Sequence, residues 1–111
     1  MAQDFKRAYA SSISNSSGSP TTLVTSNSND ALISIRCVNK TGSAANATVL
    51  IASGGTDYNV IKDAPIPSGS SLELIDSGSK IVIQNSDVVK AYADTATAID
   101  VLVSYVDAIS A

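Results

Sequence analysis

The sequence predicts an all-β fold, an antiparallel β-sandwich that is jelly-roll-like, with about eight strands and a flexible N-terminal arm. Short apolar runs recur along the chain, and clusters of Gly, Pro, Asn, Asp and Ser separate them. These residues accept turn geometry. The runs are rich in Val and Ile, whose branched side chains suit a pleated sheet. The chain has a single Glu, so the usual composition of helix surfaces is missing.

Each apolar run is expected to form one strand. The runs are shorter than most helices, and they begin roughly ten residues apart, as strands do in sandwiches and barrels. The expected strands, in chain order, comprise residues 22–25, 31–38, 47–52, 58–62, 71–75, 80–84, 88–93 and 98–106.

Alternation of side chains assigns two faces to the long strands. In the strand at 31–38, Leu32 and Val38 lie opposite the face that carries Ile33, Ile35 and Cys37. A domain of this length has too little core to bury both faces of several strands. We therefore expect oligomerisation, although a second sheet is an alternative cover for the second face. The apolar residues that face either a partner or a second sheet are Leu32, Val38, Leu50 and Leu102.

The segment 65–87 is expected to form a β-hairpin that specifies register and carries no reactive group. Pro65 and Pro67 fix φ and exclude an interior ladder position, so the chain enters the next strand from an edge or a loop. Gly69 and Gly78 can take positive φ in the two tight turns.

The first 20 residues differ in composition from the rest of the chain. Residues 11–20 include six Ser and one Gly, and such a segment buries too little apolar surface to offset its ordering entropy. We expect a flexible arm over 1–20 and a β-sandwich domain over 21–111. The outer end of the arm anchors to a partner, packs back on the domain or stays disordered. Its candidate contact residues are Phe5, Lys6, Arg7 and Tyr9.

The sequence offers few residues for catalysis or metal binding. It has no His, which removes the commonest general base and metal ligand. Cys37 is the only Cys and lies in an apolar run, so we expect a buried and unreactive thiol. Asp57, Asp63, Asp76 and Asp87 stand at strand ends, where turn roles are favoured. We therefore expect no enzymatic activity, no catalytic residues, no metal and no cofactor.

Charge and hydropathy exclude two kinds of partner. The net charge is −3 and the seven basic residues are scattered, whereas a nucleic-acid site needs clustered Lys and Arg. No run approaches the roughly 18 apolar residues of a membrane span, and the N-terminus lacks the apolar stretch of a secretory signal. We expect neither nucleic acid nor membrane as a partner.

Several motifs resemble those of small virion-associated β-proteins of tailed bacteriophages, including cyanophages. The resemblance lies in a P-x-P-x-G-x-S-L segment at 65–72, a KIVL-like strand at 80–83, a turn at 85–88 and a closing strand at 101–107. Residues 32–51 resemble the preceding hairpin of that family, a strand ending in Asn39 and followed by a Thr-Gly-Ser turn. The family strand T-x-L-Y-T-V-P is replaced here by TTLVTSNSND.

The resemblance implies a structural protein without catalytic residues. It implies a capsid decoration, neck or tail accessory component that is assembled in the host cytoplasm and located on the virion. The expected partners are the protein itself, as a symmetric homo-oligomer of three or more copies, and phage capsid, portal, neck or tail proteins. An alternative is a glycan-binding β-sandwich module for host attachment, with Tyr58 and Tyr92 as its aromatic candidates. A bacterial surface subunit is a third alternative.

Overall fold

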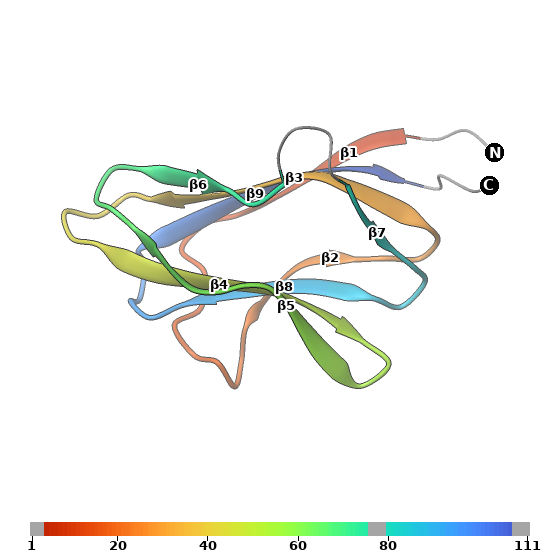
Figure 1. Cartoon of the computed structure of the whole chain (residues 1–111), viewed down its shortest axis with the longest axis horizontal. Helices are drawn as coiled ribbons and strands as arrows, with labels where there is room; N and C mark the ends of the chain where they lie inside the picture. Colours follow the sequence, from red (N-terminus) through yellow and green to blue (C-terminus); the bar gives the residue numbers. More distant parts are fainter. Residues whose placement is uncertain (1–3, 76–79, 108–111) are drawn as a thin grey trace.

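The computed structural model describes residues 4–75 and 80–107, and these form two antiparallel sheets packed face to face (Figure 1). The described part of the chain contains strands and no helix. The all-β, sandwich-type prediction is confirmed. In chain order the strands are β1 (Asp4–Ala10), β2 (Thr21–Thr25), β3 (Asp30–Asn39), β4 (Ala45–Ser53), β5 (Thr56–Ile66), β6 (Ser71–Glu73), β7 (Ile81–Ile83), β8 (Val88–Ala93) and β9 (Ile99–Asp107).

The strand order is that of a jelly roll. The first sheet has the order β1-β9-β3-β6, with β7 also paired to β3, and the second sheet has the order β2-β8-β4-β5. The pairs run from the two ends of the chain inward. β1 pairs with β9, β2 with β8, β3 with both β7 and β6, and β4 with β5. The chain is therefore one long hairpin, with β4 and β5 at its tip, rolled into a sandwich.

All eight expected strands are present, but the expected arm is not seen as a separate part. Residues 4–10 form an additional strand, β1. It pairs with β9 along its whole length, from Asp4 opposite Asp107 to Ala10 opposite Val101. The Ser-rich segment after it is held by backbone hydrogen bonds: the Ile13 N–H donates to Ile99 O at 2.9 Å, and the Ala93 N–H donates to Ser14 O at 2.8 Å. These hydrogen bonds and the buried side chain of Ile13 hold the segment against the sandwich.

A β-bulge in β3 corrects the expected faces of that strand. The register with β9 shifts between Leu32 and Ser34, which places Ile33 in the bulge. An extra residue in one strand reverses the alternation beyond it. Leu32 therefore shares the inner face with Ile35, and both are fully buried in the core. Leu32 is not a candidate for contact with a partner.

Leu50 also differs from the expectation. It lies on the outer face of β4, where Asn59 and Lys90 are its register neighbours on the two flanking strands. Its exposed fraction is only 5 %. The second sheet covers this side chain without a partner, so Leu50 offers little contact area.

The hairpin predicted over 65–87 is wrong. β6 and β7 do not pair with each other; both pair with β3, β6 along its second half and β7 along its first. β6 and β7 therefore occupy the same place beside β3, as two short segments of one interrupted edge strand. In the sequence, a cluster of turn-forming residues separates the two apolar runs. Pro65 lies in β5, an edge strand, as expected, and Gly69 has a φ of 69°. Gly78 is outside the described residues.

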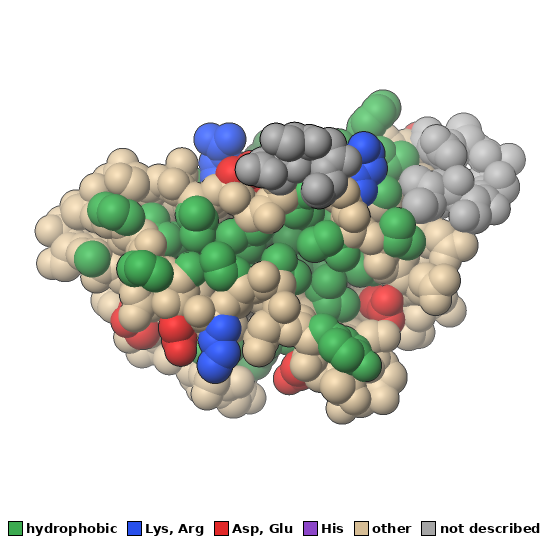
Figure 2. Space-filling model, viewed as in Figure 1, with side chains coloured by type: hydrophobic (Ala, Val, Ile, Leu, Met, Phe, Trp, Pro, Cys, Tyr) green, Lys and Arg blue, Asp and Glu red, His purple; other side chains and the backbone are tan. Residues whose placement is uncertain are grey.

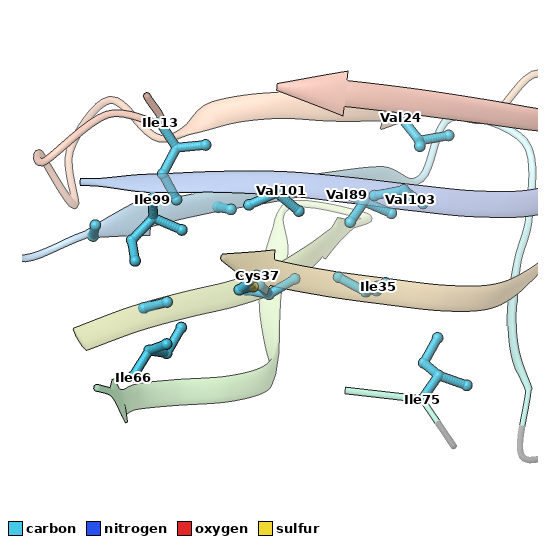
Figure 3. Close-up of a cluster of buried hydrophobic side chains, with 14 of the residues drawn as sticks. Ile13, Val24, Ile35, Cys37, Ile66, Ile75, Val89, Ile99, Val101 and Val103 are labelled. Carbon is cyan, nitrogen blue, oxygen red and sulfur yellow. The ribbon is translucent and has the colours of Figure 1, made fainter. Parts of the chain in front are cut away.

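The core lies between the sheets and is almost wholly aliphatic (Figure 3). Buried Val and Ile side chains of β3, β8 and β9 interlock there with Cys37 and Ile66. Ile13, from the connection between β1 and β2, has an exposed fraction of 1 % and belongs to the same cluster. In the space-filling view, hydrophobic side chains at the margin of this core show as a band between the two layers (Figure 2).

Asn39 is the main polar group inside the fold. Its amide donates to the carbonyl oxygens of Ser43 and Ile66 at 2.8 and 2.9 Å, and its Oδ1 accepts hydrogen bonds from Thr41. The backbone of Asn39 also bonds to Gly69 and Ser70. The two turn motifs that carry the sequence resemblance thus meet at one end of the sandwich, where their role is structural.

Replacement of Ile13 tests whether the Ser-rich connection belongs to the core. We expect Ile13→Ala to lower the free energy of unfolding by about 2–4 kcal/mol, because it leaves a cavity between packed side chains. The half-buried bulge residue is a matched control, and Ile33→Ala should cost about 1 kcal/mol or less. Urea denaturation monitored by circular dichroism measures both. Equal effects would contradict the packing of Ile13.

Candidate interaction surface

Four apolar residues form a row across the outer face of the first sheet. The register places Phe5 of β1 beside Val106 of β9, Val106 beside Ala31 of β3, and Ala31 beside Val82 of β7. Directly opposed residues of an antiparallel pair project to the same face. The two ends of the row are exposed, Phe5 by 84 % and Val82 by 57 %. The row of apolar residues therefore spans the whole width of this sheet, with its two ends exposed and Ala31 buried within it.

A second, mixed row lies farther along the same face. Tyr9 of β1 is beside Leu102 of β9, which is beside Arg36 of β3, which pairs with Glu73 of β6. Arg36 Nε and Glu73 Oε1 are 3.6 Å apart. The Tyr9 side chain is 62 % exposed, and the guanidinium carbon of Arg7 is 4.6 Å from the centre of its ring. This row offers an aromatic contact flanked by charges.

Two open hollows lie on this face between the rows and at its margin. One, of about 270 Å³, is lined by Tyr9, Ala10, Ser11, Val38, Asp100, Val101 and Leu102. The other, of about 410 Å³, is lined by Phe5, Lys6, Arg7, Ile33 and Ser104. Apolar atoms make up most of the exposed surface in both hollows, although Lys6, Arg7 and Ser104 line the second.

The structure gathers most of the residues that the sequence identified as contact candidates. Five of the eight share the outer face of the first sheet: Phe5, Arg7, Tyr9, Val38 and Leu102. Lys6 projects to the other side of β1, with the alanines that pack on the core. Leu32 and Leu50 are buried elsewhere. Sequence reasoning missed Ala31, Ile33 and Val82, which only the register of β3 brings to this face.

We refer to Lys40, Asp100, Ser11 and Ser12, beside the smaller hollow, as the Lys40 cluster. Lys40 Nζ lies 2.9 Å from Asp100 Oδ1, 2.7 Å from Ser12 Oγ and 3.2 Å from Ser11 Oγ. The Ser12 N–H donates to the same Asp100 oxygen at 2.8 Å. The three ammonium hydrogens of Lys40 thus have three oxygen partners, and the cluster fixes the end of β1.

A second polar group holds the other end of β1. Lys6 Nζ is 3.5 Å from Asp107 Oδ2, and the Ser28 hydroxyl lies 3.2 and 3.1 Å from carboxylate oxygens of Asp30 and Asp107. Hydrogen bonding with Asp30, then with Ser28, and the charge of Lys6 lower the pKa of Asp107. Both ends of β1 are therefore tied to its neighbours by polar contacts.

Within the described residues, Cys37 is not an activated nucleophile and no candidate metal cluster is found. Burial, and secondarily the charge of Glu73, raise the pKa of the Cys37 thiol to about 12, so the thiolate nucleophile is not formed at neutral pH. No group of three or more His, Cys, Asp or Glu side chains that could hold a metal ion occurs within 4–75 and 80–107. In the same ranges, no helix is long and apolar enough to cross a membrane.

The two aromatic residues expected for a glycan site do not form one platform. Tyr92 is beside Thr48, and Tyr58 is beside Ile51. Thr48 and Ile51 are three positions apart on β4, so they project to opposite faces of the second sheet. A sugar ring cannot stack on both tyrosines.

No protein-family model matches the chain, and the searches of curated proteins and of solved structures returned no match. The outer face of the first sheet, the jelly-roll fold and the sequence resemblance are therefore the observations that bear on function.

The charge of Asp100 should stabilise the fold in a pH-dependent way. Desolvation raises its pKa, but hydrogen bonds from Lys40, the Ser12 N–H and Ser11, and the charge of Lys40, bring it below its ordinary value of 3.8. A lowered pKa in the folded state gives stability that is present above 3.8 and lost as the pH falls through the folded value. The effect is about 1 kcal/mol or less, because the pair is partly exposed.

Asp100→Asn isolates this effect. We expect the wild type to exceed the variant in free energy of unfolding at pH 7 and to match it near pH 2, as measured by urea denaturation across pH. Asp57→Asn, on the exposed strand β5, controls for the loss of one negative charge. A difference between wild type and Asp100→Asn that does not change with pH would contradict the role of the carboxylate.

Proposed function

We propose that the protein is a non-enzymatic structural component of a tailed bacteriophage virion, a capsid decoration, neck or tail accessory protein. It assembles as a symmetric homo-oligomer and binds the virion lattice. The observation that carries this proposal is the exposed apolar face of the first sheet. The resemblance to phage virion proteins and the jelly-roll topology, which is common in viral capsid proteins, support it.

Assembly through a face is favoured because the sheet edges are protected. β1 carries an inward-projecting Lys6, and charges in that position discourage edge-to-edge pairing. β5 contains Pro65 and a register shift near Asp63, which has a φ of 50°. β6 and β7 have three residues each, and β2 has five. None of these edges is a long, regular template for another strand.

The first sheet is favoured over the second as the assembly face. Of the four large hydrophobic side chains that are exposed in the described part of the chain, three lie on it: Phe5, Tyr9 and Val82. The corresponding face of the second sheet presents Lys90 and Asn59 over Leu50. Exposed apolar surface is commoner at interaction sites than elsewhere on a protein, and this supports the choice of the first sheet.

The glycan-binding alternative has less support. Its two aromatic candidates lie on different faces, and the one aromatic beside a hollow, Tyr9, is next to polar groups that already bond to one another in the Lys40 cluster. A sugar would have to displace those contacts to form its own hydrogen bonds.

Replacing the ends of the apolar row tests the assembly face. We expect Phe5→Ser with Val82→Ser to weaken self-association at least tenfold, because both side chains lose burial at the interface. Tyr58→Ser, on β5 and about as exposed as Val82, is the control and should have no effect. Sedimentation velocity over a range of concentrations measures the association constant. An unchanged constant for the double variant would contradict the assignment of this face.

The location on the virion needs a separate experiment. We expect mass spectrometry of phage particles, purified from cells in which the chain is made during infection, to detect it at several copies per particle. Particles washed at high salt should retain it, because apolar contact is less sensitive to salt than surface ion pairs are. Its absence from particles, together with its presence in the soluble host fraction, would contradict the virion assignment.

A further inference from the structure

The junction between β1 and the rest of the chain is strained. Ser12 has a φ of 54°, a left-handed conformation that a residue with a Cβ adopts at a cost. On one side of it, β1 ends at Ala10; on the other, Ile13 is buried and its N–H is bonded to Ile99 O. Ser11 and Ser12 therefore form a bend between β1, which pairs with β9 up to Val101, and Ile13, which bonds to Ile99 at the start of β9.

β1 itself contributes little to the core. None of its seven residues is fully buried, and its inward side chains are Lys6, Ala8 and Ala10. It is held by its ladder to β9, by the ion pair of Lys6 with Asp107 and, at the bend, by the Lys40 cluster. A strand that lies at the edge and packs few side chains can leave without opening the core between the sheets.

We propose that β1 is exchanged between two copies of this chain. Ser11 and Ser12 straighten, Ile13 stays in place as the anchor, and β1 of each copy pairs with β9 of the other. This inference rests on the proposed self-association and specifies how pairs of copies are joined within it. The second copy offers β1 the same ladder and the same Lys6–Asp107 ion pair, so exchange conserves the contacts of β1.

Two opposing features of the bend control the exchange. Straightening relieves the positive φ of Ser12, and a strained hinge favours exchange. It also breaks the hydrogen bonds of Ser11 and Ser12 with Lys40 and Asp100, which favour the closed form. Substitutions at Ser12 should therefore shift the equilibrium in predictable directions.

Ser12→Gly accepts the bend without strain and should lower the exchanged fraction about fivefold. Ser12→Pro should raise it at least fivefold, because proline fixes φ near −65° and removes the N–H that bonds to Asp100. Thr97, with a φ of 56° in the connection from β8 to β9, provides the control. Thr97→Gly relieves equal strain away from the bend and should leave the exchanged fraction unchanged.

Disulfide trapping measures the exchanged fraction directly. Arg7 and Ser104 are register partners on the outer face, at a separation that suits a disulfide. Two full-length variants, Arg7→Cys and Ser104→Cys, are unfolded together in reductant, refolded and oxidised. Cys37 is kept, because it is buried in the folded protein. Exchange predicts a covalent heterodimer on non-reducing gels. Lys62→Cys, on the exposed strand β5, replaces Ser104→Cys in the control mixture.

The same samples separate this proposal from the proposed assembly. A heterodimer above the Lys62→Cys control, increased by Ser12→Pro and decreased by Ser12→Gly, is the expected result. If the yield of covalent heterodimer does not exceed that of the Lys62→Cys control even with Ser12→Pro, the proposed exchange of β1 is wrong. If light scattering then still shows a defined oligomer, assembly through the outer face stands without exchange. If every variant is a monomer, both the exchange and the self-association are wrong.

Discussion

The pairing of β1 with β9 is the contact on which the surface of this protein depends. It completes the first sheet, and it alone brings Phe5 beside Val106 and Tyr9 beside Leu102. Without it the outer face would lose its two exposed aromatic side chains and both hollows would lose part of their lining. The pairing depends in turn on Ile13, which anchors the connection in the core, and on polar contacts at either end of the strand.

Much of the fold follows from local pattern. Period-two alternation and turn clusters locate β2 to β9, because strands with one buried face need that alternation. The topology also agrees with the prediction of a jelly roll. β1 was not predicted as a strand, because the Ser-rich segment after it is ordered by hydrogen bonds to distant residues such as Ile99 and Ala93. Amino-acid composition does not reveal hydrogen bonds between residues that are distant in the sequence.

The incorrect predictions of the inner and outer faces of β3 and of a hairpin at 65–87 have one physical origin. A single bulge residue, Ile33, moves Leu32 into the core, and the interruption between β6 and β7 turns an expected hairpin into one broken edge strand. Bulges and interruptions are set by pairing across the sheet, not by the local sequence. The candidate surface was therefore predictable in part: Phe5, Arg7, Tyr9, Val38 and Leu102 were identified, but the register that unites them with Val82 was not.

The proposed function rests on surface rather than on reactive groups. Where charged side chains lie near the apolar face, they are mostly engaged within the chain: Arg36 with Glu73, Lys40 with Asp100, and Lys6 with Asp107. Such pairing leaves the apolar rows as the part of this face best suited to bind another molecule. In the proposed symmetric oligomer, every copy would bury the same apolar rows.

Oxidative footprinting of the native assembly tests this account most directly, because it reports which side chains the assembly covers. Tyr58, which is 59 % exposed on β5, provides the internal reference. We expect Phe5 and Tyr9 to become protected from hydroxyl radicals as concentration rises and the protein associates, while Tyr58 stays reactive. Protection of Tyr58 with continued reactivity of Phe5 and Tyr9 would show that another face is buried and would contradict the central claim.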